Sequence, residues 1–495
     1  MSEIDGLHIL GPGDDVGVVI REGGPVPVGH KVAVHDVAAG SPVIKYGHVI
    51  GYATRDIAVG DHVHSHNLTY GDHGAPEHGA TAAAHPPELT LDGSGTFKGI
   101  RRSDGRVATR NVIAIVSTVN CSATVCQRIA DAVTRAGILE DFDGIDAVVP
   151  VTHTSGCGMS GDGDNLRRLR RTLAGYAGHA NVGGVLVVAL GCEVNQMTDF
   201  MADIPRRDDL HILELGIQDM GGTRATIDAG IRAVEQLARD MGEVTREDFP
   251  VSELVMGLNC GGSDGWSGIT ANPALGVASD MLVARGGRSV LAETPEIYGA
   301  EDLLLNRAVS DGVAQKLRDI IARWESDVEV TGESLDNNPS PGNKEGGITT
   351  ILEKSLGAVA KGGHSPMAAV YEYAEPIDEP GFGFMDTPGY DPVSVTGLIA
   401  GGANVVVFTT GRGSALGYGI VPVVKVSTNS TLFRRMPDDM DLDAGDIVEQ
   451  GVPVADKGRE IYERIVSAAS GERTRSEDLG YGSQEFVPWL LGPVF

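Results

Sequence analysis

The 495-residue chain has little lysine and few aromatic residues. Only nine of its 39 basic residues are lysine, aromatic residues make up 5% of the chain, and the formal net charge is -29. An acidic excess of this size argues against nucleic acid or an anionic membrane surface as the main partner. The acidity favours a role in solubility.

Long apolar runs and paired cysteines are also missing. The first residues, MSEIDGLHILGPGDD, contain no basic region followed by an apolar one, and no later segment offers the roughly 18 to 20 apolar residues of a membrane span. We therefore expect a soluble cytoplasmic protein. The five cysteines include no CxxC pair, which argues against a zinc finger, and we expect reduced thiols rather than disulfides.

The hydrophobic pattern divides the chain into three parts. Residues 1–70 are short β-type runs broken by Gly and Pro, which predicts a small all-β module, and 71–95 have the composition of a linker. Apolar runs then alternate with helical patterns, which predicts largely parallel sheets covered by helices. The expected fold class is α/β, with one α/β domain at 96–248 and a second at 249–495. The polar segment 331–347 is expected to be a long functional loop.

Four of the five cysteines share a position in this pattern. Each of Cys121, Cys157, Cys192 and Cys260 directly follows a predicted strand, whereas Cys126 lies inside a predicted helix. In open α/β sheets the carboxyl ends of the strands form the ligand crevice. We therefore expect the four thiols to converge on one cleft. The alternative is that they are small buried hydrophobic residues.

The thiols have neighbours that also bind metals. Together with His153 and Glu193 they would suit a soft or borderline metal such as iron, as a single ion or an iron–sulfur cluster. His62, His64 and His66 alternate in DHVHSHN, so on a strand all three face the same way and can bind a divalent metal. We count His64 and His66 as candidate ligands. A solvated strand is the alternative, because ten of the 14 histidines precede residue 86.

Two glycine-rich loops carry a cation each. SPGNKEGG contains Lys344 and TTGRGSALGYG contains Arg412. Glycine lets the backbone approach a ligand closely, lysine supplies a point charge, and arginine can clamp a carboxylate with two hydrogen bonds. The GxxxxGK[ST] pattern of a nucleotide-binding P-loop is absent. The loops therefore favour a small anionic ligand.

Five stretches together resemble a known family. They are GLNCGGSDGWSGITANPALG, ETPEIYGAEDLL, NPSPGNKEGGITTILEKSLG, FTTGRGSALG and ALGCEVNQ. The chain is similar over nearly its whole length to the altronate dehydratase and galactarate dehydratase family of sugar-acid dehydratases. VIKYGHVIGYA, near the N-terminus, resembles the β-clip SAF module of that family.

The resemblance implies loss of water from an aldonic or aldaric acid to give a 2-keto-3-deoxy acid. It also implies dependence on Fe2+, and the alternatives are Mn2+ and an iron–sulfur cluster. HVHSHN is closer to the altronate enzyme, so D-altronate is the expected substrate, and galactarate or a sulfolactate-cleaving activity are alternatives. The expected partner is a small sugar acid, and we expect a homo-oligomer. A sugar-acid sensor without catalysis is the alternative of another class.

Within this resemblance, residues can be given roles. Lys344 and Arg412 are candidates for holding the carboxylate and the enediolate, as catalytic and substrate-binding groups. The backbone amides around Gly261 and Gly262 could add a nest for the same oxyanion. The substrate-binding set also includes Ser263 and Asn343.

Proton transfer needs a base beside the substrate carboxylate and an acid at the leaving hydroxyl. His153, Asp264 and Glu193 are the candidates, in that order. Asp264 has an alternative role, because an aspartate after a strand can simply cap the following turn.

Overall fold

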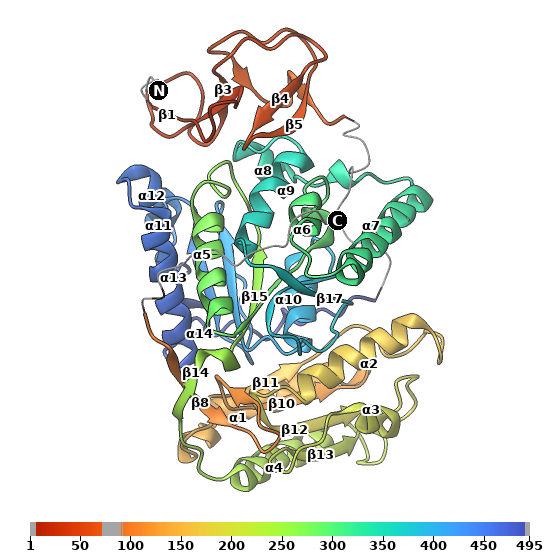
Figure 1. The fold of residues 1–495 in the computed structure, drawn as a ribbon. Coiled ribbons are helices and arrows are strands. Elements are labelled where there is room, and N and C mark those ends of the chain that lie inside the picture. Colours follow the sequence, from red (N-terminus) through yellow and green to blue (C-terminus); the bar gives the residue numbers. More distant parts are fainter. Residues whose placement is uncertain (1–5, 72–90, 92, 491–495) are drawn as a thin grey trace.

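The computed structural model describes residues 6–71, 91 and 93–490, and arranges them as three bodies in a row (Figure 1). A small β module lies at one end, a body with a seven-stranded sheet in the middle, and a body with a four-stranded sheet at the other end. Most of the predicted linker, 71–95, lies outside the described residues. Among the helices of the described residues, none has the length and apolar character needed to cross a membrane.

The N-terminal module consists of two small antiparallel sheets, as the short β-type runs predict. Their strand orders are β1-β2-β3-β6 and β4-β5-β7. Val16, Val43, Ile50 and Val63 are fully buried between them. The strands are β1 (Leu7–His8), β2 (Val16–Val19), β3 (Lys31–Ala33), β4 (Pro42–Lys45), β5 (His48–Ala53), β6 (His62–Val63) and β7 (Leu68–Thr69).

The four-stranded sheet is entirely parallel, in the order β11-β10-β12-β13. Its two central strands are buried at every position, as expected for strands covered by helices on both faces. Helices α1 and α4 pack together on one face, and α2 packs against α10 (Asp391–Ala400) of the middle body. The elements are β10 (Val112–Ser117), α1 (Asn120–Arg135), η1 (Ile138–Asp141), β11 (Ala147–Val151), α2 (Asp164–Ala177), β12 (Val182–Ala189), α3 (Met197–Asp203), β13 (His211–Gly216) and α4 (Thr223–Met241).

A three-stranded antiparallel sheet joins this body to the middle one. It contains β8 (Thr96–Arg101), β9 (Val107–Ala108) and β14 (Glu247–Pro250), in the order β14-β8-β9. Strand β8 precedes the four-stranded body in the chain and β14 follows it, and the two strands pair with Phe249 opposite Phe97. The chain therefore returns from this body beside the place where it entered.

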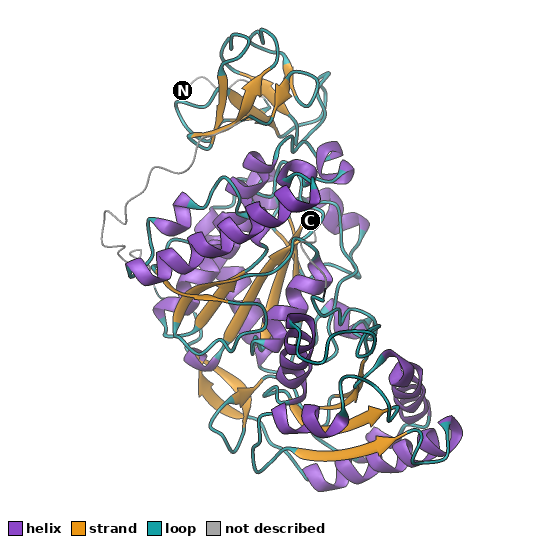
Figure 2. Ribbon diagram, turned by 90° about the vertical axis from the view of Figure 1, so that its right-hand side faces the viewer, coloured by secondary structure: helices purple, strands orange, loops and turns teal. Residues whose placement is uncertain are grey.

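The middle body is built on a parallel seven-stranded sheet with the order β17-β18-β16-β15-β19-β20-β21. Central strand β15 is buried throughout. The carboxyl ends of parallel strands meet at one edge, and the N-terminal module lies over the loops of this edge (Figure 2). The strands are β15 (Val255–Cys260), β16 (Arg288–Leu291), β17 (Met367–Tyr371), β18 (Gly381–Met385), β19 (Val405–Thr410), β20 (Val423–Ser427) and β21 (Leu442–Asp443).

Helices cover both faces of this sheet (Figure 2). The polar segment 331–347 is more ordered than a loop, because it holds two short helices, η4 and α8. Ser340 and Asn343 form a capping box at the start of α8. The helices are η2 (Val251–Glu253), α5 (Ala271–Ala284), η3 (Thr294–Glu296), α6 (Asp302–Leu305), α7 (Asp311–Thr331), η4 (Leu335–Asn337), α8 (Pro341–Glu345), α9 (Ile351–Val359), η5 (Ala360–Gly362), α10 (Asp391–Ala400), α11 (Ser430–Arg435), α12 (Asp446–Glu449), α13 (Val454–Ala469) and α14 (Arg475–Asp478).

Candidate functional site

Glycine-rich loops meet where the N-terminal module rests on the seven-stranded sheet. The Gly265 amide donates to the Gly346 carbonyl at 2.8 Å, and the Arg412 amide donates to the Gly262 carbonyl at 2.8 Å. A side-chain carbon at Gly265 would lie 1.9 Å from the carbonyl oxygen of Gly29 in the module. Glycine is required here because backbone packs directly on backbone. We call this contact region the junction.

Asp264 closes the turn after β15. Its Oδ1 accepts hydrogen bonds from the amides of Trp266 and Ser267, at 3.1 and 3.0 Å, and from the Thr428 hydroxyl at 2.9 Å. Its Oδ2 accepts from Asn429 Nδ2 at 3.0 Å. Burial raises the pKa of Asp264, and these hydrogen bonds oppose the rise. Both oxygens are therefore engaged, which agrees with the capping alternative.

Three of the predicted substrate-binding residues, Gly261, Ser263 and Asn343, are buried in contacts within the protein. The Gly261 amide donates to the Thr409 carbonyl at 3.1 Å, so it is not free to form the expected oxyanion nest. Asn343 and Ser263 are buried, and Asn343 Nδ2 donates to the Ser263 carbonyl at 2.8 Å. Gly262 is exposed, with a φ of 59°. Ser263 and Asn343 thus shape the loops.

Lys344 and Arg412 lie at the outer rim of the junction. The Arg412 side chain is 48% exposed and contacts Glu345 Oε2 at 3.0 Å through Nη2. Lys344 is half-buried, and its ammonium has no hydrogen bond or ion pair within the described part of the chain. Both side chains are accessible, and their predicted role in binding an anion stays a prediction.

A buried ion-pair group holds the module to the middle body. Lys31 Nζ and Lys45 Nζ of the module lie 2.7 and 2.8 Å from the two carboxylate oxygens of Glu353, and all three side chains are at most 2% exposed. Lys31 also donates to Thr349 Oγ1 at 2.7 Å. Burial alone would raise the pKa of Glu353, but the two lysines outweigh it and lower the pKa to about 2. We call this group the lysine clamp.

A small cavity lies inside the junction. It measures about 10 Å³ and is lined by residues of both bodies, among them Tyr46, Asp264 and Lys354. That volume accommodates about one water molecule, whereas pockets for small ligands measure about 300 to 1,000 Å³. A sugar acid therefore does not fit in this cavity.

The histidines of the module gather, but not along one strand. Strand β6 ends at Val63, because Asn67 Oδ1 accepts from the His64 amide and Asn67 Nδ2 donates to the His62 carbonyl, which forms a turn. The prediction that His62, His64 and His66 alternate on one strand face is wrong for this reason. The turn nevertheless brings their rings together, with centroids 5.4 Å apart for His62 and His64 and 5.3 Å for His62 and His66.

This histidine group faces the C-terminal end of α8. His30 joins it, with its Nδ1 3.0 Å from His62 Nε2. The Nε2 atoms of His30 and His64 lie 3.0 and 2.9 Å from the carbonyl oxygens of Glu345 and Lys344. Burial and the neighbouring imidazoles lower the pKa of His62 to about 4, so it is neutral at pH 7. Among the described residues, these rings do not form a three-ligand set within 4.8 Å.

Three of the predicted metal ligands lie in the other α/β body. They follow β10, β11 and β12, and all three thiols are exposed. Their loops are tied together, because the Asn120 amide donates to the Ser155 carbonyl at 2.8 Å and the Asn195 amide donates to the Gly156 carbonyl at 3.0 Å. The prediction that these cysteines lie at one sheet edge agrees with this placement. They are Cys121, Cys157 and Cys192.

His153 and Glu193 support these loops from inside. His153 Nε2 lies 3.1 Å from the Ser117 carbonyl, and its Nδ1 accepts from the Ser155 amide at 3.1 Å. Burial lowers the pKa of His153 to about 4. Glu193 accepts from Thr118 Oγ1 at 2.5 Å and from the Gly191 amide at 2.7 Å. Both side chains are buried and fully engaged, so the expected role in proton transfer has no free nitrogen or oxygen to use.

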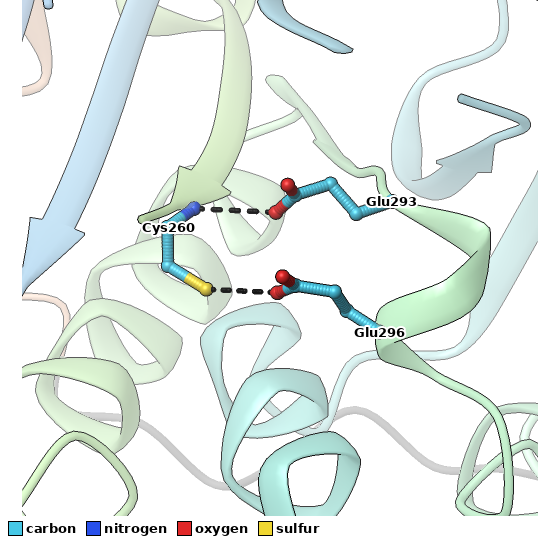
Figure 3. A group of neighbouring side chains, drawn as sticks. All are labelled: Cys260, Glu293 and Glu296. Carbon is cyan, nitrogen blue, oxygen red and sulfur yellow. Dashed lines mark hydrogen bonds between the residues drawn. The ribbon is translucent and has the colours of Figure 1, made fainter. Parts of the chain in front are cut away.

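Cys260 does not join the other thiols, so the predicted convergence of four cysteines on one cleft is wrong. It ends β15 of the seven-stranded sheet and is buried. Its Sγ lies 3.2 Å from Glu296 Oε2, and its amide lies 3.4 Å from Glu293 Oε2 (Figure 3). Within the described residues, this trio is the one set of three metal-binding side chains with ligand atoms within 4.8 Å of one another.

Two buried lysines complete the group around Cys260. Lys361 Nζ lies 2.6 Å from Cys260 Sγ, and Lys354 Nζ lies 2.5 Å from Glu296 Oε1. Burial raises the pKa of Cys260 to about 12, and burial also raises the pKa of Glu293 well above its usual range. Burial would raise the pKa of Glu296 too, but the two lysines lower it.

Sequence reasoning missed the buried charges of both groups. The lysine clamp joins residues more than 300 positions apart, and the stretch ETPEIYGAEDLL contributes to the family resemblance without a predicted role for Glu293 or Glu296. The scarcity of lysine was the one signal in the sequence that could have pointed to them, because six of the nine lysines are buried. The lysines below 10% exposure are Lys31, Lys45, Lys354, Lys361, Lys425 and Lys457.

Family models match all three bodies. Residues 9–71 match the altronate/galactarate dehydratase SAF domain, and residues 99–242 match the second domain of D-galactarate dehydratase/altronate hydrolase. Residues 251–494 match the C-terminal domain of D-galactarate/altronate dehydratase. The β module that the N-terminal residues predicted is therefore a SAF domain.

Curated relatives match nearly the whole chain. An altronate dehydratase of Escherichia coli (strain K12) is 38% identical over 94% of this chain and 91% of its own length. An altronate dehydratase of Bacillus subtilis (strain 168) is 35% identical over 93% and 91%. A galactarate dehydratase (L-threo-forming) of Escherichia coli (strain K12) is 35% identical over 93% and 89%. The chain belongs to the altronate/galactarate dehydratase family.

Proposed function

We propose that the chain is a hydro-lyase that removes water from D-altronate and forms a 2-keto-3-deoxy acid. The observation that carries this proposal is the similarity to two altronate dehydratases along 91% of their length. The similarity to a galactarate dehydratase has nearly the same extent, so galactarate is the alternative substrate. Cytoplasmic location and assembly as a homo-oligomer stay predictions.

The substrate carboxylate is assigned to the rim of the junction. Elimination removes the proton at C2, beside the carboxylate, so negative charge develops on an enediolate that needs a nearby cation. Arg412 can clamp a carboxylate with two parallel hydrogen bonds, and the Lys344 ammonium can neutralise the enediolate. Their accessible side chains support this assignment.

Proton transfer at this rim is assigned to the histidine group of the SAF module. The first three candidates, His153, Asp264 and Glu193, already use their polar atoms in hydrogen bonds. A neutral imidazole can accept the C2 proton. His62 engages Nε2 with His30, and its Nδ1 has no hydrogen bond within the described residues. His62 is therefore our candidate for the base.

Iron is the cofactor that the family resemblance implied, and the exposed thiols offer suitable donors. Two sulfurs on one metal ion lie at most about 4.6 Å apart, because a metal–sulfur bond measures about 2.3 Å. Among the described residues, Cys121, Cys157 and Cys192 do not form a three-ligand set within 4.8 Å, so a single ion there would require the exposed thiols to move together. A cluster, whose cysteines bind different irons, is the alternative. Bound iron would supply Lewis-acid chemistry in the four-stranded body. That body lies at the other end of the molecule from the junction (Figure 1), so the iron is not assigned to the leaving hydroxyl of a substrate held at the rim.

The experiment is an anaerobic assay with two substrates. Protein reconstituted with ferrous ion and sulfide is given D-altronate or galactarate, and keto acid is measured with semicarbazide. We expect product from altronate at a higher kcat/KM than from galactarate. The reverse order would make the chain an aldarate dehydratase. Thermal stabilisation by both acids without any product would overturn the enzyme assignment in favour of a sensor.

A further inference from the structure

Two histidines of the SAF module contact each other through their ring nitrogens. His30 directly precedes β3, and His62 begins β6, the strand that pairs with β3. The Nδ1 atom of His30 lies 3.0 Å from Nε2 of His62, and the ring centroids are 5.1 Å apart. His30 is 8% exposed, and His62 is half-buried. A hydrogen bond between two imidazoles holds one proton, so one of the two nitrogens donates and the other accepts.

The other nitrogen of His30 decides which one donates. Its Nε2 lies 3.0 Å from the carbonyl oxygen of Glu345, and a carbonyl oxygen only accepts, so Nε2 carries a proton. Burial lowers the pKa of His30, which keeps the ring neutral at pH 7. A neutral imidazole has a single N–H, so Nδ1 of His30 is an acceptor. The proton between the two rings therefore belongs to Nε2 of His62.

This arrangement leaves the lone pair of His62 on Nδ1. The neutral ring has its one proton on Nε2, and Nδ1 has no hydrogen bond within the described residues. An unprotonated ring nitrogen is the atom of an imidazole that accepts a proton, and the hydrogen bond of the other nitrogen sets which one it is. The bonds that run from the Glu345 carbonyl through His30 thus fix the tautomer of His62 that a base needs.

His30 is itself held from both sides along the chain. Its carbonyl accepts from the Val19 amide at 2.8 Å, and the next residue, Lys31, belongs to the lysine clamp. A catalytic group keeps its orientation within about 10–20° only when the residues around it are locked in turn. His30 meets this condition, and it is therefore suited to hold the ring of His62 in one orientation.

We propose that His30 is a positioning residue, which holds the proton of His62 on Nε2 and leaves Nδ1 open to the C2 proton of the substrate. The proposal rests on the proposed function, in which His62 is the base. A base oriented by a hydrogen-bonded partner is the arrangement of catalytic dyads and triads. Loss of this partner should lower kcat and leave the KM for altronate unchanged, because Arg412 still holds the carboxylate.

The position of the proton can be measured without substrate. The full chain is labelled in its histidine ring nitrogens and studied by NMR spectroscopy, and the His62 signals are identified by their loss in His62→Gln. We expect a proton on Nε2 that exchanges slowly with water, and none on Nδ1. In His30→Ala this proton should exchange fast, because its acceptor is gone. His30→Asn should restore slow exchange, because the asparagine Oδ1 replaces the lost Nδ1 as acceptor.

Kinetics with altronate separate positioning from docking. His30→Ala and His30→Asn both lose the bond to Glu345, so a role in docking alone lowers kcat equally in both. Positioning instead leaves His30→Asn at least about 10-fold more active than His30→Ala, a part of the roughly 10²- to 10⁴-fold that a general base contributes. His64→Ala is the matched docking control. Its Nε2 makes the same kind of bond, to the Lys344 carbonyl at 2.9 Å, and its loss should leave the slow exchange at His62 unchanged.

Three results would each contradict the role of His30. They are a proton on Nδ1 of His62 in the unaltered chain, slow exchange that persists in His30→Ala, and equal kcat values for the two variants at His30. His35→Ala, at an exposed histidine of the module, should change neither the exchange nor kcat. If the unaltered chain forms no keto acid from altronate or galactarate, the proposed function is wrong, and the NMR measurement still decides whether His30 fixes the tautomer of His62.

Discussion

The substitution Glu353→Gln removes the charge at the centre of the lysine clamp. Glutamine keeps the shape of the side chain but leaves the ammonium groups of Lys31 and Lys45 buried without a counter-charge. Removing one partner of a buried ion pair costs about 3–5 kcal/mol. We expect this loss to fall on the docking of the SAF module, which raises the undocked fraction roughly 10²- to 10⁴-fold.

Trp266 reports this docking. It is 3% exposed, packs against the module, and its indole N–H donates to the Val19 carbonyl at 3.4 Å. Replacing Trp324 and Trp489 by Phe leaves it as the single tryptophan of the chain. In that background, urea unfolding is followed by tryptophan emission. The Trp266 transition of Glu353→Gln should occur at a lower urea concentration, and the free energy of undocking extrapolated to water should be about 3–5 kcal/mol lower.

The matched control is the same substitution at an exposed pair. Glu235 pairs with Arg239 on the surface of α4, with side chains 39% and 53% exposed. We expect Glu235→Gln to change stability by less than about 0.5 kcal/mol. If Glu353→Gln moves the Trp266 transition no further than this control does, the buried charges do not hold the module and the reasoning is wrong.

Three further predictions follow from the same contacts. The folded-state pKa of Glu353 is lowered from 4.5 to about 2, so its ion pairs stabilise docking fully above pH 4.5. An acid titration followed by tryptophan emission should therefore show undocking as the pH falls from 4.5 to 2. Arg412→Lys should lower kcat/KM for altronate at least about 10-fold, because an ammonium cannot clamp a carboxylate, whereas Arg434→Lys at an exposed pair should leave it unchanged. Cys157→Ser should lose iron, sulfide and visible absorption under anaerobic reconstitution, and Cys126→Ser should retain them; equal cofactor content in both would contradict the exposed-thiol assignment.

Local sequence patterns were sufficient to predict the elements of the fold. The apolar runs at 112–117 and 182–189 became strands buried on both faces, as parallel strands in covered sheets require. The position of each cysteine after a strand was likewise visible in the sequence. What the pattern cannot tell is which sheet a strand joins, because a buried strand has the same composition in either sheet. Cys260 was misplaced for that reason.

Short-range side-chain contacts explain the second error. Alternating histidines predict a strand, but the Asn67 side chain bonds the backbone at both His62 and His64 and turns the chain instead. The buried charge groups could not be predicted from the sequence for a different reason. A lysine in a short strand is ordinarily solvated, and only the folded chain brings Glu353 to Lys31 across more than 300 residues.

The strength of the lysine clamp bears on how substrate reaches the site. The cavity lined by both bodies measures about 10 Å³, so a sugar acid enters that space only if the SAF module separates from the middle body. Separation returns Glu353 and its two lysines to water together, so its cost is not the roughly 3–5 kcal/mol of removing one partner while the others stay buried. The rim differs from this cavity, because the side chains of Lys344 and Arg412 are accessible there with the module docked. Binding of the substrate at the rim therefore requires no separation of the module.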